Sequence, residues 1–138
     1  MIKFLILNRE QIKTFVTIQK HILISICDPE AEPVEIFSDN PPEGILFLRF
    51  PDFDKEIEGY KYNYLVFDKY NARDILRFVK QHKDNIELIV CQCEAGISRS
   101  AGVAGALAKI LNGDDTEFFK KYLPNSLVYN TILKEYYG

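Results

Sequence analysis

The feature that most constrains the fold of this chain is a strand, a loop and a helix that follow one another directly. Residues 86–90 are apolar and β-branched, which predicts a buried strand, and residues 101–111 are rich in alanine and leucine, which predicts a helix. Cys93 and Arg99 lie between them, six positions apart, and Gly96 lets the loop backbone turn. The loop therefore ends at a helix N-terminus, where unpaired N–H groups and the helix dipole favour an anion.

The residue types in this loop suit phosphoryl chemistry. A thiol beside a cation and a helix N-terminus ionises more readily, so Cys93 is a candidate nucleophile at neutral pH. The guanidinium of Arg99 can bind two phosphate oxygens together, which an ammonium group cannot do. Ser100 is a candidate hydrogen-bond donor to the sulfur of Cys93. Such a donor stabilises the thiolate when a covalent phosphocysteine intermediate is hydrolysed.

The run from Cys93 to Ser100 resembles the Cys-(any five)-Arg-(Ser/Thr) loop of the protein tyrosine and dual-specificity phosphatase superfamily. Residues 93–107 are similar to the loop and helix of compact dual-specificity-type enzymes, and residues 22–26, 48–52 and 124–129 are similar to a group of small bacterial phosphatase-like proteins. The resemblance implies a compact phosphatase that hydrolyses phosphate monoesters without a metal or other cofactor. It also implies that phosphate is bound by the loop residues Glu94, Ala95, Gly96, Ile97, Ser98 and Arg99.

One position departs from the superfamily pattern. The residue before the nucleophile is usually histidine there, and this chain has Gln92. An amide can position the loop through hydrogen bonds but cannot carry charge. We therefore expect Cys93 to ionise less readily than the family cysteine. Gln92 also keeps open an alternative function, in which the loop holds a phosphate with little or no turnover.

Hydrolysis needs a general acid to protonate the oxygen that leaves phosphorus. In the superfamily this acid is an aspartate on a separate upstream loop. The resemblance favours Asp52, which follows a predicted strand at residues 45–50, and Asp54 is the alternative. Asp68 is better interpreted as the N-cap of a helix over residues 69–81, because apolar residues recur there at helical spacing.

Strands alternate with helices along the chain, which predicts an α/β fold with a mostly parallel sheet flanked by helices. The expected strands lie near residues 2–7, 22–27, 45–50 and 86–92. Besides the helices already mentioned, we expect a short one from Asn8 to about residue 18, one that starts near residues 114–116 and one from Asn125 to about residue 136. At 138 residues the chain is predicted to form a single phosphatase-like domain, 1–138, with the loop at the carboxyl end of a strand.

Composition and charge disfavour some classes of binding partner. The chain is 47% hydrophobic and 27% charged with a net charge of −3, and it has no basic cluster, which disfavours nucleic acid as a partner. No apolar run reaches the length of a membrane span, so we expect a cytoplasmic protein that does not bind membranes. Its oligomeric state stays open, and a monomer is compatible with the sequence. Two distant histidines, His21 and His82, do not form a zinc site.

The three cysteines fit a reducing compartment better than a disulfide framework. Cys91 stands two positions before Cys93 and would face the same side of a strand, so it is a candidate to resolve an oxidised Cys93. The preferred interpretation is that Cys91 and Cys27 are buried structural residues. For the substrate, a chain of this length suits a shallow site that accepts phosphotyrosine, phosphoserine or phosphothreonine on proteins. A non-protein phosphate ester, such as a phosphoinositide, a nucleotide or a small ester, is the alternative substrate.

Overall fold

The computed structural model describes residues 1–36 and 38–138. Its sheet has the strand order β1-β4-β2-β3, and every pairing is parallel. The strands are β1 (Lys3–Leu7), β2 (His21–Cys27), β3 (Ile45–Arg49) and β4 (Leu88–Gln92). The helices are α1 (Arg9–Thr14), α2 (Lys69–His82), α3 (Arg99–Asn112), α4 (Thr116–Lys121) and α5 (Ser126–Tyr137), with short 3-10 turns η1 (Asn63–Leu65) and η2 (Lys83–Asn85). The structure thus confirms the predicted α/β class and its parallel sheet.

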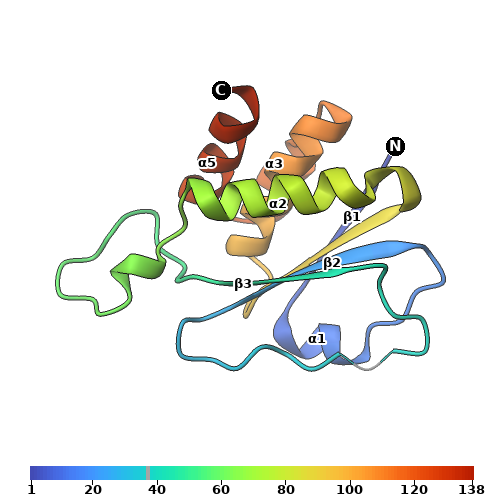
Figure 1. Cartoon of the computed structure of the whole chain (residues 1–138), viewed down its shortest axis with the longest axis horizontal. Coiled ribbons are helices and arrows are strands. Elements are labelled where there is room, and N and C mark those ends of the chain that lie inside the picture. Colours follow the sequence, from blue (N-terminus) through green and yellow to red (C-terminus); the bar gives the residue numbers. More distant parts are fainter. Residues whose placement is uncertain (37) are drawn as a thin grey trace.

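The sheet lies between two unequal layers of helices. Helices α2, α3 and α5 cover one face, and the short α1 covers the other (Figure 1). Side chains alternate along the two central strands, so Ile24 and Ile89 join the larger core under the three helices. Leu23 and Val90 join the smaller core, which α1 completes with Ile12. The central strands are buried on both faces, which explains their nearly continuous apolar sequences.

Polar side chains determine where two of the helices start. Asn8 forms a capping box with Gln11 at α1, and Asp68 forms one with Asn71 at α2, so the interpretation of Asp68 as a cap is correct. The predicted extent of α1 is wrong, because the helix ends at Thr14 and not near residue 18. The following Val16, Thr17 and Ile18 are β-branched, which disfavours continuation of a helix.

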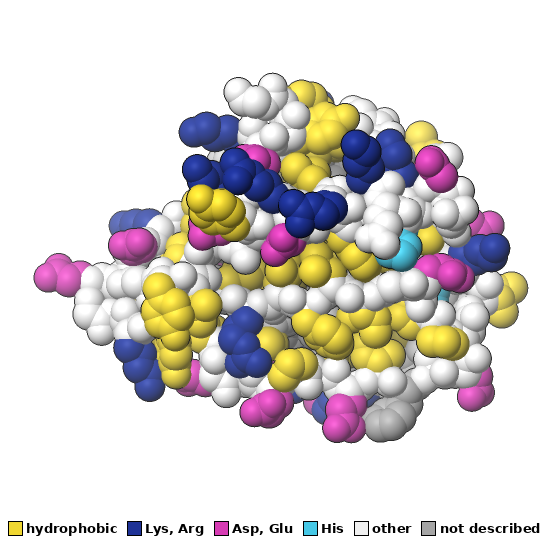
Figure 2. Space-filling view, viewed as in Figure 1, with side chains coloured by type: hydrophobic (Ala, Val, Ile, Leu, Met, Phe, Trp, Pro, Cys, Tyr) yellow, Lys and Arg dark blue, Asp and Glu magenta, His cyan; other side chains and the backbone are white. Residues whose placement is uncertain are grey.

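Because the strands are parallel, all four carboxyl ends meet at one edge of the sheet. From that edge residues 50–68 leave β3, extend away from the body of the molecule and return to α2 (Figure 1). The rings of Phe50 and Phe67 pack edge to face with centroids 4.9 Å apart where this segment leaves and rejoins the core. Figure 2 shows acidic side chains at the outer end of the segment.

Candidate active site

The loop with the predicted nucleophile joins β4 directly to α3. Cys93 follows the last residue of β4, and Arg99 is the first residue of α3. The Cys93 thiol is 2% exposed; Gly96 N donates to Sγ at 3.2 Å, and Ser100 Oγ lies 3.0 Å from Sγ. Two polar hydrogens can therefore stabilise negative charge on the sulfur. This placement is a consequence of the strand–loop–helix order that the sequence predicted.

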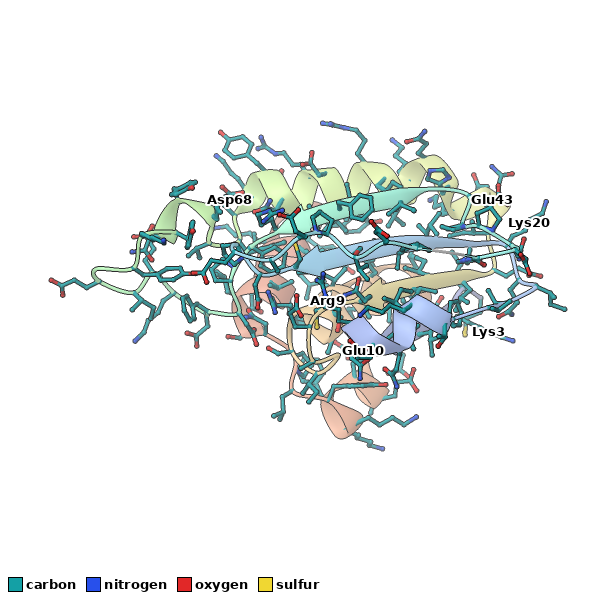
Figure 3. The ribbon with its side chains drawn as sticks, turned by 90° about the horizontal axis from the view of Figure 1, so that it is seen from below. Lys3, Arg9, Glu10, Lys20, Glu43 and Asp68 are labelled. Carbon is teal, nitrogen blue, oxygen red and sulfur yellow. The ribbon has the colours of Figure 1, made fainter. Side chains whose placement is uncertain are left out.

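The turn between β1 and α1 supports the loop from behind. Cys93 N donates to Leu7 O at 3.3 Å, and Arg9 N donates to Glu94 O at 3.2 Å. Gly96 has a φ of 67°, and a Cβ there would lie 2.9 Å from Asn8 N, so glycine is required on two grounds. Arg9, labelled at the start of α1 in Figure 3, also forms an ion pair with Glu94 at 3.1 Å.

Several backbone N–H groups of the loop have no hydrogen-bond acceptor in the part of the chain that the structure describes. Within the described residues, no protein acceptor is found for the N–H groups of Glu94, Ala95, Ile97 and Ser98. Ser98 is the N-cap of α3, yet its side chain makes no capping bond because its hydroxyl donates elsewhere. The first turn of α3 is consequently left without a cap, which is the arrangement that binds an anion at a helix N-terminus.

Arg99 is 5% exposed, and the protein holds its guanidinium on two sides. One terminal nitrogen, Nη1, donates to Phe50 O at 2.8 Å, and the other, Nη2, forms an ion pair with Asp28 Oδ1 at 2.7 Å. Asp28 follows β2, the neighbour of β4 in the sheet. Asp28 is not among the site residues predicted from the sequence. The signal that points to it is its position directly after a strand that ends beside the loop.

Asp52 lies beside the loop, as its expected role requires. Its Oδ1 accepts a hydrogen bond from Ser98 Oγ at 2.7 Å and another from Asn125 Nδ2 at 2.9 Å. Asp54 has no hydrogen bond to the loop within the described part of the chain, although both carboxylates line the same open hollow of about 380 Å³. The geometry therefore favours Asp52 over Asp54. The sequence predicted Asn125 only as the start of a helix and not as part of the site.

The hollow lies between the protruding segment and the start of α5, and Ser98 is the loop residue that lines it. Apolar side chains are exposed around it: Leu123 is 75% exposed, Ile97 46% and Ile57 40%. Its lining comprises Asp52, Phe53, Asp54, Ile57, Ser98, Leu123, Pro124, Asn125 and Ser126. The site is thus open and shallow, and it combines apolar groups with carboxylates.

Gln92, the residue before Cys93, is fully buried. Its Nε2 donates to Cys93 O at 3.1 Å, and its Oε1 accepts from Ser25 Oγ on the adjacent strand β2. Gln92 therefore connects the loop to the centre of the sheet. This is the positioning function that the sequence predicted an amide could keep.

The other two cysteines are buried, as their preferred interpretation predicts. Burial raises the pKa of the Cys91 thiol well above its usual range, and the nearby Cys93 adds to this effect. Burial also raises the pKa of Cys27, with Arg49 as the largest opposing influence. Cys91 and Cys93 belong to the same core cluster, as expected for two residues on one face of a strand. The high pKa of Cys91 makes it a poor thiolate and does not favour a redox role.

In the described parts of the chain, residues 1–36 and 38–138, no group of three or more His, Cys, Asp or Glu side chains is arranged to hold a metal ion. Over the same residues, none of the helices has both the length and the apolar character needed to cross a membrane.

Solved structures identify the class of this fold, which is that of the protein tyrosine and dual-specificity phosphatases. Human DUSP28 is 12% identical, with a TM-score of 0.59 over 96% of this chain and 90% of its own. The human tyrosine phosphatase-like serine/threonine/tyrosine-interacting protein is 20% identical, with a TM-score of 0.55 over 86% of this chain and 76% of its own. PTPMT1 in complex with PI(5)P is 14% identical, with a TM-score of 0.51 over 86% of this chain and 76% of its own.

These likenesses confirm the fold implied by the resemblance of the loop. No protein-family model matches the sequence, and no curated protein matches it either.

Proposed function

We propose that this chain is a phosphatase that hydrolyses phosphate monoesters on proteins through a phosphocysteine intermediate. The single observation that carries the proposal is the environment of the Cys93 sulfur. Gly96 N and Ser100 Oγ contact it, and the surrounding loop has unpaired N–H groups and ends at the buried Arg99. A fold shared with tyrosine and dual-specificity phosphatases adds support.

Phosphate binding uses the free donors of the loop. The unpaired N–H groups between Cys93 and Arg99 and the uncapped start of α3 supply several donors to the terminal oxygens of the phosphate. Arg99 has five N–H donors, and the protein contacts engage only part of this set. Phe50 O and Asp28 orient its plane, so that the remaining donors are available for the phosphate without a large change of rotamer.

The first chemical step transfers the phosphoryl group to sulfur. The Cys93 thiolate attacks phosphorus, an S–P bond forms, and the bond from phosphorus to the ester oxygen breaks. That oxygen leaves with a proton from Asp52. Within the described residues, protein donors contact only Oδ1 of Asp52, so Oδ2 is the oxygen that carries this proton.

The second step restores the enzyme. A water molecule attacks phosphorus, Asp52 accepts its proton, and the S–P bond breaks to release inorganic phosphate. Ser100 Oγ and Gly96 N then stabilise the departing thiolate. Asp52 acts first as acid and then as base, and no net proton is consumed.

Charge around the loop favours a phosphoprotein over a polyanionic substrate. Arg9 is paired with Glu94, and Arg99 with Asp28, whereas the carboxylates of Asp52 and Asp54 line the hollow beside the loop. These carboxylates repel additional phosphates, and the exposed Ile57, Ile97 and Leu123 offer contacts to the side chains that flank a phosphorylated residue. PTPMT1 was solved in complex with PI(5)P, so this lipid is the appropriate competitor substrate.

The test is turnover by the intact chain. We expect the wild type to release p-nitrophenol from p-nitrophenyl phosphate and phosphate from phosphotyrosine or phosphothreonine peptides, and to be less active on PI(5)P. Cys93→Ser removes the nucleophile, so it should lose essentially all activity and still bind phosphate. Faster hydrolysis of PI(5)P than of the peptides would contradict the protein substrate, and equal rates for wild type and Cys93→Ser would contradict the mechanism.

The alternative function is a phosphate-binding module with little or no turnover. The uncharged Gln92 before Cys93 favours it, and one structural neighbour is named as a phosphatase-like interacting protein. This alternative predicts that the wild type binds a phosphotyrosine peptide as tightly as Cys93→Ser does and releases no phosphate from it.

A further inference from the structure

Asn125 has more hydrogen bonds than a helix cap requires. It is 7% exposed and lies directly before α5, where its Oδ1 accepts from Val128 N at 3.0 Å. Its Nδ2 donates to Asp52 Oδ1 at 2.9 Å and to Phe53 O at 3.1 Å. Its backbone N donates to Ser98 O at 3.0 Å. One residue thus joins α5, the nucleophile loop and the segment that carries the proposed acid, the loop through its backbone and the other two through its side chain.

Capping does not require the amide nitrogen of Asn125. Serine and aspartate cap helices about as well as asparagine, because only the side-chain oxygen is used. Asparagine differs from both in its NH₂ group, and among the described residues that group donates hydrogen bonds only to Asp52 and Phe53. The residue type at position 125 therefore points to a second role, directed at Asp52.

We propose that Asn125 is a positioning residue for Asp52. This proposal rests on the proposed function. It assigns to the reaction a residue that acts through Asp52 and not by binding the substrate. Ser98 Oγ and Asn125 Nδ2 both donate to Oδ1 of Asp52. Asn125 N donates to Ser98 O, so hydrogen bonds connect the three residues in a closed ring. The ring occupies one carboxylate oxygen and directs the other, Oδ2, to the ester oxygen.

The helices hold Asn125 in place. A Cβ on Gly102 would lie 2.9 Å from Asn125 O and 3.1 Å from Val128 Cβ, so the glycine allows the start of α5 to lie directly against α3. Gly102 N also donates to Ser98 O at 2.9 Å. The contact between α3 and α5 thereby fixes the position of the acid relative to the loop.

The experiment compares two substrates whose leaving groups differ in basicity. The tyrosine oxygen leaves as a strong base, with a pKa of about 10, and needs a proton, whereas p-nitrophenolate is a weaker base and needs it less. Asn125→Ser keeps a cap and removes the NH₂ group. We expect its kcat/KM on a phosphotyrosine peptide to fall at least about tenfold and its kcat/KM on p-nitrophenyl phosphate to fall much less, because kcat/KM reports the step in which the ester oxygen leaves.

A double variant separates positioning from a general loss of structure. If Asn125 acts through Asp52, Asn125→Ser combined with Asp52→Asn should be no slower than Asp52→Asn alone. Asp68→Ser is the matched control, because it alters the cap of α2 and leaves the site untouched. Its kcat/KM should stay unchanged on both substrates.

The possible failures are distinguishable. Equal losses of kcat/KM on both substrates, or additive losses in the double variant, would overturn the role of Asn125 and leave the phosphatase intact. If the wild type hydrolyses neither ester, both the proposed function and the role of Asn125 are wrong.

Discussion

Arg99 brings a positive charge into the interior next to the nucleophile, and Asp28 supplies its counter-charge. The guanidinium is 5% exposed, whereas the Asp28 side chain is 51% exposed. Asp28 can therefore interact with solvent and with the arginine at the same time. Its value lies in orientation, because a planar guanidinium must present the correct edge to a phosphate.

We predict that Asp28→Asn weakens phosphate recognition. The neutral amide keeps the size of the side chain but loses the charge-assisted contact to Arg99, so kcat/KM should fall roughly tenfold. Inhibition by vanadate should weaken in parallel. Asp54→Asn is the control, because its carboxylate has no contact with Arg99 among the described residues. Unchanged vanadate inhibition in Asp28→Asn would contradict this role.

Residues of the site differ in how far the sequence alone could predict them. Cys93, Arg99 and Ser100 lie within one loop of eight residues, so their spacing and the adjacent strand and helix were enough to group them. Asp28 and Asn125 reach the loop from β2 and from the start of α5. Their partners depend on strand order and on helix packing, and the spacing of residues along the chain predicts neither of these.

At the scale of elements, helix and strand types followed from apolar periodicity, whereas some boundaries did not. The capping boxes at Asn8 and Asp68 determined two helix starts correctly. The end of α1 was missed, because residues 15–18 are apolar enough to extend a helical pattern although their β-branched members disfavour it. The tight contact between α3 and α5 was also not predictable, since it depends on what lies opposite each glycine.

From the contact between α3 and α5 we expect substitution by alanine to have different effects on stability at two glycines of α3. In Gly102→Ala the new Cβ would lie 2.9 Å from Asn125 O, so the helices must separate, and we expect the free energy of unfolding to fall by about 1–3 kcal/mol. In Gly105→Ala the nearest atom is 3.5 Å away, which is an ordinary contact, and the gain in helix propensity should keep stability within about 1 kcal/mol of wild type. Urea unfolding measures both. Equal destabilisation would contradict this account.

At the scale of the whole molecule, ligand binding at the loop should stabilise the fold. The loop connects β4 and α3 and is supported by the turn after β1, so a bound oxyanion joins parts of the chain that separate on unfolding. At a vanadate concentration 100 times the Kd, linkage predicts about 2.7 kcal/mol of stabilisation, which raises Tm by roughly 5–15 °C. Thermal unfolding measures this increase. Arg99→Ala should show little of it, and an equal rise in that variant would locate the anion elsewhere.

The packing of Phe50 against Phe67 has a consequence for engineering. The two rings meet where the protruding segment leaves and rejoins the core, so the segment is closed by a contact that does not involve its outer part. Residues 55–66 can therefore be exchanged or lengthened, while Asp52 stays bound to Ser98 and Asn125. The protein is in this respect a scaffold on which a library of recognition loops could be displayed beside the fixed loop of Cys93.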